Sequence, residues 1–284
     1  MKRLTMKELL MWAREEHIAI GAFNIFNYIS TKAAIDAANN LNTPILLQTS
    51  VGTVKKFGAQ ALFDMMDLLR RNSSVQIVFH LDHCTDVALA KQCVDIGWDS
   101  VMIDLSAKPI EENIFFTKEV KQYANHKGVC VEGELGIIAG VEEDISAKDG
   151  VLVEYDNCIR YVTETGIDAF APAIGTAHGM YEKEVKLNYH LITQLTETNE
   201  TPIVIHGGTG LSDQQFLDLI QCGASKINVS TALKYAYIDS IRAYVQKENR
   251  ENNPIKLDNA AEMEVRKVVE EHIARFRPWN NLKN

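Results

Sequence analysis

The chain lacks the features that are typical of membrane, secreted and disulfide-bonded proteins. None of its apolar runs approaches the ~20 residues of a membrane-spanning helix. Basic residues begin the sequence, but Glu8, Glu15 and Glu16 interrupt the apolar core that a signal peptide would need after them. The five cysteines are an odd number without CxxC spacing, which favours free thiols in a reducing compartment. We therefore expect a cytoplasmic protein.

Positive charge is also scarce. The formal net charge is -9 at pH 7, which repels nucleic acid and anionic membranes at long range but still allows a small phosphate to bind locally. Hydrophobic residues make up 46% of the 284 positions and charged residues 24%, which is ordinary for a globular enzyme with a large core. The composition argues against nucleic-acid and membrane partners and leaves small-molecule chemistry open.

Apolar runs that end in polar residues recur along the chain. The clearest run covers residues 76–84 and ends in His80, Asp82 and His83. Near-continuous apolar runs are typical of buried parallel strands, and enzymes of the α/β class collect their chemistry at the carboxyl ends of such strands. Capping of the next helix by the same polar residues is the alternative for this stretch alone. Seven further runs read as strands, at residues 19–25, 44–50, 100–106, 129–136, 169–175, 202–205 and 226–229.

Helical patterns alternate with these runs. Thr5 and Glu8 form a possible capping box that starts a first helix, which ends near residue 16. The economical interpretation is an α/β fold with one (β/α)8 TIM barrel over residues 1–284, an N-terminal lid helix and a C-terminal helical tail. A doubly wound sheet would also alternate, but the chain has no GxGxxG turn. Other predicted helices cover residues 30–40, 60–71, 87–95, 110–125, 157–164, 189–199, 213–221 and 257–276.

One segment fits neither pattern. Residues 137–150 are acidic and contain glycine, and we interpret them as too irregular for a helix or strand and too long for a minimal connection. Loops of this kind are usually functional or mobile.

Three histidines follow predicted strands: His83, His178 and His206. In a barrel they converge on one face, and three imidazoles with an open fourth position are the ligand set of a catalytic zinc ion. Each histidine alone reads more simply as a structural or solvated residue, so the prediction depends on their conjunction. Asp104 and Glu134 also end strands, where they could bind a second cation, orient a ligating histidine, or form salt bridges. We interpret His80 as a core or supporting residue.

Two loops of small residues follow the seventh and eighth predicted strands, at 206–210 and 228–231. In barrels, loops at these places commonly hold a phosphate group with backbone N–H and hydroxyl groups. A glycine turn by itself is weak evidence, but both loops have suitable composition at the expected strands.

Six motifs together closely resemble the class II, zinc-dependent ketose-bisphosphate aldolases, and the nearest branch is the tagatose-bisphosphate aldolase type. The resemblance runs from about residue 6 to residue 269, in order and with matching spacings. The motifs are HLDH at 80–83, VMIDLS at 101–106, VEGELG at 131–136, GTAHG at 175–179, HGGTG at 206–210 and KINVST at 226–231.

The resemblance implies a role for each site residue. It implies zinc on the three histidines, proton transfer by Asp82, and a second, non-catalytic divalent or monovalent cation at Asp104 and Glu134. It also implies that Glu142, within residues 137–150, exchanges the proton on the carbon adjacent to the carbonyl. The residues implied to hold a dihydroxyacetone phosphate portion are Asn24, Ser50, Gly179, Gly207, Gly208, Thr209, Asn228, Val229, Ser230 and Thr231.

The implied chemistry is reversible cleavage of a ketose 1,6-bisphosphate, of the tagatose or fructose type, into dihydroxyacetone phosphate and glyceraldehyde 3-phosphate. Cleavage leaves negative charge on the substrate, which zinc stabilises as an electrophile. Two positions depart from the family pattern: Ala232 replaces an acidic residue, and Ile255 replaces an arginine that helps to bind the distal phosphate in fructose-bisphosphate aldolases. Loss of the arginine favours a ketose 1-phosphate as the alternative, although Lys256 could supply a point charge in its place. The family also suggests a homo-oligomer, a dimer or a tetramer.

Two other functions stay as rivals, a metallohydrolase and a non-catalytic subunit, and a Schiff-base mechanism is disfavoured for the aldolase itself. A barrel metallohydrolase would need a His-x-His pair at the first strand, where residues 24–26 supply none. A Schiff-base aldolase would need a lysine at the active end of the barrel, and we place Lys226 at the start of the eighth strand, the wrong end. A non-catalytic, metal-binding partner subunit of an aldolase would have no use for Asp82 and Glu142.

Overall fold

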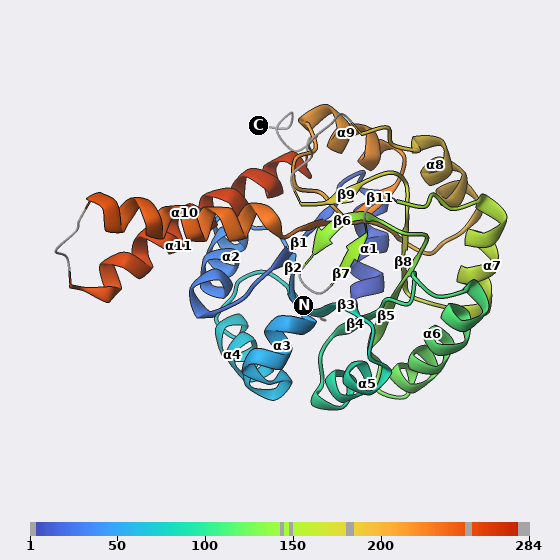
Figure 1. The fold of residues 1–284 in the computed structure, drawn as a ribbon, viewed down its shortest axis with the longest axis horizontal. Coiled ribbons are helices and arrows are strands. Elements are labelled where there is room, and N and C mark those ends of the chain that lie inside the picture. Colours follow the sequence, from blue (N-terminus) through green and yellow to red (C-terminus); the bar gives the residue numbers. More distant parts are fainter. Residues whose placement is uncertain (1–3, 143–144, 148–149, 180–184, 248–251, 278–284) are drawn as a thin grey trace.

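The computed structural model describes residues 4–142, 145–147, 150–179, 185–247 and 252–277. Eight parallel strands close into a barrel, and helices surround it as an outer ring (Figure 1). The predicted (β/α)8 barrel is therefore confirmed. Around the barrel the strands are β1 (Ile20–Asn24), β2 (Ile45–Ser50), β3 (Ile77–Cys84), β4 (Ser100–Ile103), β5 (Cys130–Leu135), β8 (Ala169–Pro172), β10 (Ile203–Ile205) and β11 (Ala224–Val229), and β11 pairs with β1.

The helices agree with most of the predicted ranges, and two additional helices are present. Ser50 ends β2 and also caps α3, since its Oγ accepts a hydrogen bond from the Thr53 N–H. Helix α10 runs beside α11, and together they project from the barrel as an arm (Figure 1). The helices are α1 (Met6–Glu15), α2 (Tyr28–Asn40), α3 (Val51–Phe57), α4 (Ala59–Arg70), α5 (Val87–Ile96), α6 (Ile110–Asn125), α7 (Tyr155–Thr165), α8 (Tyr189–Thr198), α9 (Asp213–Gln221), α10 (Thr231–Lys247) and α11 (Pro254–Arg275).

Helix α1 closes the end of the barrel at which the strands begin. The predicted capping box is present: the Thr5 side chain accepts from the Glu8 N–H, and the Glu8 carboxylate accepts from the Thr5 N–H. The apolar face of α1 packs against the first inward-pointing residues of the strands, and we call this set the base cluster. Its members are Met6, Leu9, Leu10, Ala13, Ile18, Ile20, Ala22, Leu46, Val78, Cys130, Ala169, Ala171 and Val204.

The prediction that residues 137–150 contain no regular element was wrong. Strands β6 (Ala139–Glu142) and β7 (Ile145–Ala147) pair antiparallel, and β6 pairs parallel with β9 (Ala177–His178). Gly140 explains the tight pairing, because it has a φ of 98° and a Cβ there would lie 2.2 Å from the His178 carbonyl oxygen. These strands belong to a small sheet separate from the barrel sheet. Their sequence therefore lacks the apolar pattern of a barrel strand.

Among the described residues, none of the helices is long and apolar enough to cross a membrane.

Candidate functional site

The structure brings the three predicted histidines together at the carboxyl ends of the strands, which we call the mouth of the barrel. His83 is the second-to-last residue of β3, His178 lies in β9, and His206 follows β10 directly. The ring centroid of His83 lies 4.9 Å from that of His178 and 4.5 Å from that of His206. All three side chains are buried, and one nitrogen of each lies within 4.8 Å of the other two. The three rings can therefore share one ion.

The backbone at His83 is unusual. Its φ is 46°, in the left-handed region that side chains other than glycine seldom adopt, and strain of this kind costs about 1–3 kcal/mol. The pairing of β3 with β4 shifts register between Leu81 and Cys84, as in a bulge. Bulges re-aim a side chain near active sites, and this one turns the His83 ring toward the other two histidines.

Buried carboxylates hold two of the imidazoles by one ring nitrogen each. His83 Nδ1 donates to Asp104 Oδ2 at 2.7 Å, and His206 Nε2 donates to Glu132 Oε1 at 2.8 Å. Each bond leaves the other ring nitrogen with a lone pair, which is the arrangement that supports metal-ligating histidines. His206 Nδ1 is fully buried and makes no hydrogen bond within the part of the chain that the structure describes. Three buried imidazole nitrogens of this kind fit a zinc ion.

The charges around the rings favour a cation at the mouth. Burial lowers the pKa of His83, but the Asp82 carboxylate and the hydrogen bond to Asp104 outweigh it and raise that pKa well above its ordinary value. Burial and the nearby His83 lower the pKa of His206, yet the hydrogen bond to Glu132 and the Glu134 carboxylate, whose Oε2 lies 3.2 Å from His206 Nδ1, raise it to about 9. The surrounding carboxylates thus stabilise positive charge, whether a proton or a metal ion supplies it.

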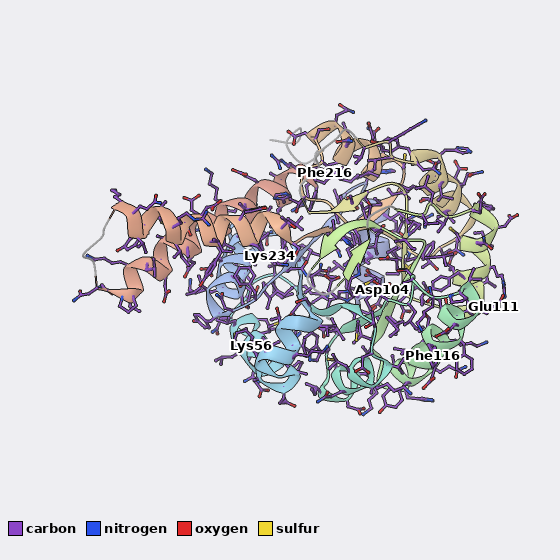
Figure 2. The ribbon with its side chains drawn as sticks, viewed as in Figure 1. Lys56, Asp104, Glu111, Phe116, Phe216 and Lys234 are labelled. Carbon is purple, nitrogen blue, oxygen red and sulfur yellow. The ribbon has the colours of Figure 1, made fainter. Side chains whose placement is uncertain are left out.

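Asp104 and Glu134 stand beside the histidines, and Asp104 lies within the ring of helices in Figure 2. Burial raises the pKa of Asp104, but the hydrogen bond from His83 outweighs it and brings the pKa to about 2. Glu134 Oε2 lies 3.2 Å from His206 Nδ1 and 3.9 Å from His83 Nδ1. His83, Asp104 and Glu134 also form a second group whose ligand atoms lie within 4.8 Å of one another. The geometry allows both roles considered for these carboxylates, a second cation site and the orientation of a histidine.

Asp82 is held by three amide groups. Asn24 Nδ2 donates to Asp82 Oδ2 at 2.8 Å and Gln48 Nε2 to the same oxygen at 3.2 Å, while Asn228 Nδ2 donates to Oδ1 at 3.3 Å. An ionised carboxylate only accepts hydrogen bonds, so three donors suit that form. Asp82 is 1% exposed and directly precedes His83, so its carboxylate is fixed next to the histidine cluster. This is the arrangement that a positioned general base needs.

The glycine-containing segments at 175–179 and 206–210 meet the loop at 228–231 around a small pocket in the mouth. At Gly207, with a φ of 70°, a Cβ would lie 2.3 Å from the Ala177 carbonyl oxygen, so only glycine lets the two loops approach so closely. Most of the predicted phosphate-binding residues line this pocket, but the buried Val229 side chain packs in the core behind β11. The lining residues are His178, Gly179, Gly207, Gly208, Thr209, Asn228, Ser230 and Thr231.

Comparison with known proteins agrees with this geometry. The family model described as fructose-bisphosphate aldolase class-II matches residues 4–281. The chain belongs to this family. It is 35% identical over 286 residues to a fructose-bisphosphate aldolase of Staphylococcus aureus, which covers all of both chains, and 36% identical over 260 residues to one of Geobacillus stearothermophilus, which covers 90% of this chain and 91% of that one. The crystal structure of the YdjI aldolase from Escherichia coli K12 superposes with a TM-score of 0.84 at 28% identity, over 95% of this chain and 96% of that one.

The protein is therefore a class II aldolase, a carbon–carbon lyase. The metallohydrolase and the partner subunit are set aside, because the relatives above are themselves named aldolases. The two relatives from Staphylococcus aureus and Geobacillus stearothermophilus are named fructose-bisphosphate aldolases, and a preference of this chain for a tagatose substrate stays a prediction.

Glu142 ends strand β6, and its side chain lies outside the part that the structure describes. The backbone of this segment is close to the cluster, since Gly140 pairs with His178. Ser50 lies in register with Asp82 on the neighbouring strand, and its Oγ bonds to Thr53 Oγ1 at 3.1 Å. The strand pairing therefore brings Ser50 to the mouth, as in the implied substrate set.

Two residues that contact the predicted site residues were not themselves predicted from the sequence. Gln48 lies two positions before Ser50, and Glu132 lies two positions before Glu134. The signal for each was the period of two along a strand, since residues two apart point to the same side of the sheet.

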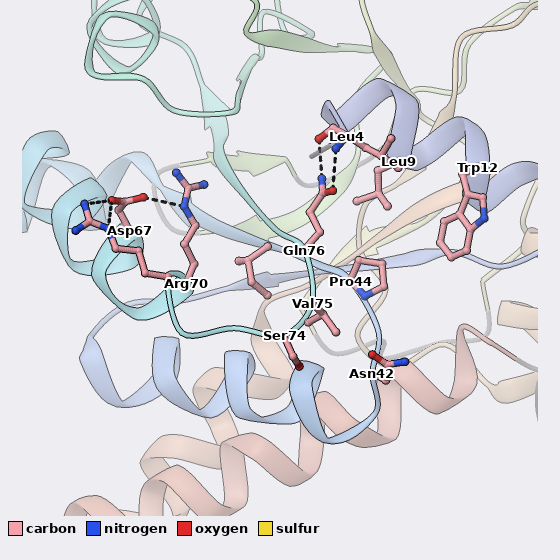
Figure 3. A pocket seen from close by; sticks show the side chains of 12 residues that line it. Leu4, Leu9, Trp12, Asn42, Pro44, Asp67, Arg70, Ser74, Val75 and Gln76 are labelled. Carbon is pink, nitrogen blue, oxygen red and sulfur yellow. Dashed lines mark hydrogen bonds and ion pairs between the residues drawn. The ribbon is translucent and has the colours of Figure 1, made fainter. Parts of the chain in front are cut away.

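A larger pocket of about 750 Å³ lies at the opposite end of the barrel, beside α1 and α4 (Figure 3). Leu9, Trp12 and Pro44 line its apolar part, and Arg70 in its wall is already paired with Asp67 and Asp99. None of the predicted site residues lines this pocket. Size alone therefore does not locate the chemistry in this aldolase.

Proposed function

We propose that this class II aldolase depends on zinc and reversibly cleaves a ketose 1,6-bisphosphate, of the fructose or tagatose type, into dihydroxyacetone phosphate and glyceraldehyde 3-phosphate. The observation that carries the proposal is the buried cluster of His83, His178 and His206 with the carboxylate of Asp82 beside it. When it is bound there, zinc supplies the electrophile that offsets the negative charge left by carbon–carbon cleavage.

The chain itself supplies proton transfer and binding. Asp82 accepts the proton of the C4 hydroxyl as the bond breaks, and its three amide donors hold it in place for that step. Glu142 delivers a proton to the carbon that has lost its partner, from the small sheet that pairs with the strand of His178. The loops with Gly179, Gly207 and Ser230 hold the phosphate of the dihydroxyacetone portion through backbone N–H and hydroxyl groups.

A second cation, divalent or monovalent, belongs in this proposal at Asp104 and Glu134, whose oxygens approach His83. Oxygen ligands of this type suit hard cations. The hydrogen bond from His83 to Asp104 orients the imidazole at the same time. A cytoplasmic location likewise stays a prediction of the sequence.

A ketose 1-phosphate is the alternative substrate, and the residue at position 255 favours it. Ile255 is 62% exposed at the start of α11, where it offers no positive charge to a distal phosphate. Ala232, at the start of α10, carries no charge, and its backbone N–H donates to Thr209 Oγ1 at 3.4 Å, so it does not separate the two substrates. Condensation of dihydroxyacetone phosphate with aldehydes that carry or lack a terminal phosphate separates the two substrates. Equal rates with both would favour the 1-phosphate.

We further propose that the aldolase is a homo-oligomer, a dimer or a tetramer. The arm of α10 and α11 leaves large apolar side chains exposed, and exposed apolar patches mark contact surfaces. These side chains are Tyr235, Ile238, Val245, Ile255 and Met263. Sedimentation of the purified chain measures the state directly.

Chelation tests the zinc proposal. Protein stripped of metal should release no dihydroxyacetone phosphate from fructose or tagatose 1,6-bisphosphate, and added Zn²⁺ should restore the release. A matched sample passed through the same steps without chelator controls for inactivation. Activity that survives complete metal removal would rule out the zinc mechanism.

A further inference from the structure

A buried chain of charged groups lies below the histidine cluster. Lys226 Nζ donates to Glu132 Oε2 at 2.8 Å, and Glu132 Oε1 accepts from His206 Nε2 at 2.8 Å. All three side chains are 0–1% exposed. One carboxylate therefore joins a lysine to a predicted metal ligand.

The strand pattern explains why these groups meet. Gly133 points outward, where a Cβ would lie 2.5 Å from Tyr161 Oη, so Glu132 and Glu134 on either side of it both point into the barrel. Lys226 lies on β11, and β10 and β8 separate that strand from β5. The long lysine side chain crosses the barrel interior to reach Glu132.

Burial of the Lys226–Glu132 pair costs free energy, so stability alone does not explain why the pair is there. Among the described residues, Lys226 is the only lysine or arginine that is buried. A buried ion pair is often no more stable than apolar residues of the same size, because both charges lose their water. The pair is therefore weak as a device for stability, and its geometry at His206 indicates what else it does.

Glu132 has a second imidazole within reach. His80 Nε2 lies 3.7 Å from Glu132 Oε2, and His80 Nδ1 is bonded to Ser100 Oγ at 2.6 Å. Lys226 occupies the same Oε2 atom at 2.8 Å, which leaves Oε1 for His206. The lysine thus selects which histidine the carboxylate holds.

We propose that Lys226 is a positioning residue for His206: it fixes the Glu132 carboxylate so that His206 donates its Nε2–H and turns Nδ1 toward His83 and His178. The proposal rests on the proposed zinc function. It also assigns a use to a barrel lysine other than Schiff-base chemistry, since the Nζ atom is committed to Glu132 and lies outside the small pocket at the mouth.

The test measures metal binding by the full chain. Zn²⁺ affinity is determined by competition with a chromophoric chelator, and the Co²⁺ absorption spectrum reports the ligand geometry. Loss of a carboxylate that orients a ligating histidine typically weakens metal binding about 10–100-fold. We expect Lys226→Met to weaken Zn²⁺ binding by a factor in that range and to alter the Co²⁺ spectrum.

A double-mutant cycle tests the route through Glu132. Glu132→Gln should weaken Zn²⁺ binding to a similar extent, and Lys226→Met should then add little in the Glu132→Gln background. A full, independent loss in that background would contradict the proposal. If Lys226→Met does not fold, Lys226→Gln replaces it, because its shorter amide leaves Glu132 Oε2 unheld and the same loss is expected.

Lys121→Met is the matched control. Lys121 pairs with Asp168 outside the histidine cluster, and both side chains are nearly buried. Its replacement should lower stability and leave the Zn²⁺ affinity and the Co²⁺ spectrum unchanged. Lys226→Met with wild-type affinity and spectrum would overturn the inference alone, whereas a wild-type chain that binds no Zn²⁺ would overturn the proposed function.

Discussion

The two ends of the barrel use the same inward-facing positions for opposite purposes. Along β3 these positions are Val78 in the base cluster, then His80, then Asp82 at the mouth. The base is apolar and closed by α1, while the mouth is a set of buried polar groups that hold one another by hydrogen bonds. Residues two apart on a strand point to the same side of the sheet, so successive inward positions move along the barrel from its apolar base to its polar mouth. Positions near the base support stability, and positions at the mouth support chemistry.

The two ends of the barrel should therefore respond differently to substitution. Burial of apolar surface stabilises the fold by about 25 cal/mol per Å², so the contribution of the base depends on how much apolar side chain it buries. The mouth concentrates carboxylates and imidazoles in a buried space and holds His83 in a left-handed conformation, which costs stability. Substitutions at the mouth should therefore remove activity, and substitutions at the base should remove stability.

The largest expected effect is at Asp82. Asp82→Ala removes the proposed proton acceptor, and loss of a general base typically lowers the rate about 10²–10⁴-fold. We expect kcat for cleavage to fall by that factor while Zn²⁺ still binds, because Asp82 lies outside the three-histidine set. Steady-state kinetics and metal analysis of the same sample measure both.

Asp82→Asn is the control for this variant. Alanine leaves the amides of Asn24, Gln48 and Asn228 without their acceptor, at a cost of about 1–3 kcal/mol for a buried group. Asparagine keeps one acceptor oxygen, so it should lose the same activity with a smaller change in the free energy of unfolding. Near-normal turnover in Asp82→Asn would contradict the assigned role.

At the base the expected effect is on stability. Leu10 is fully buried in the base cluster, and Leu10→Ala should lower the free energy of unfolding by about 2–5 kcal/mol. Well below the unfolding midpoint, kcat should not change, because the cavity opens at the far end from the histidines. Urea denaturation and kinetics at low temperature measure the two quantities.

Glu16→Ala, at an exposed position just after the same helix, serves as the control and should change stability by less than ~0.5 kcal/mol. A large loss of kcat in folded Leu10→Ala would show that the two ends are coupled and would contradict their separate roles.

The smallest effect concerns the thiols. Burial raises the pKa of Cys84 and Cys130 to about 11 and that of Cys93 and Cys158 to about 12, whereas Cys222 is half-buried. The thiolate is the reactive form, so the native protein should react with a thiol reagent at one site and the unfolded protein at all five.

Cys222→Ser should abolish the native reaction. Cys130 belongs to the base cluster, so Leu10→Ala should speed its labelling and leave the reaction of Cys222 unchanged. Rapid labelling of several thiols in the native wild-type chain would show that the core is more open than its burial indicates.

Much of this architecture could be predicted from sequence, because long apolar runs and strong helical periods report burial directly. Helices α6 and α9 have the predicted bounds, and the three histidines meet where the barrel topology required. Helix α3 was missed because Ser50 serves both as the end of a strand and as a helix cap. The small sheet at Gly140 was missed because its pairing depends on a contact with residue 178, distant in sequence.

The polar partners were harder to predict for a physical reason. The eighth strand was predicted to begin at Lys226, whereas β11 begins at Ala224 and places Lys226 within the strand, from where its side chain reaches across the interior to Glu132. A buried lysine is rare, so composition gives no reason to expect one there. Strand periodicity shows that a side chain points inward, but it does not show which partner the side chain will meet. Pairings such as Gln48 with Asp82 depend on how eight strands close, which no local pattern encodes.

That closure also has a consequence for biosynthesis. Strand β1 receives its second neighbour only from β11, where Ile20 pairs with Lys226 and Phe23 with Val229. A ribosome must deliver nearly the whole chain before the ring can shut, and until then β1 presents an open edge. Nascent chains of this protein therefore pass through a long interval in which a strand edge is available to chaperones or to other nascent chains.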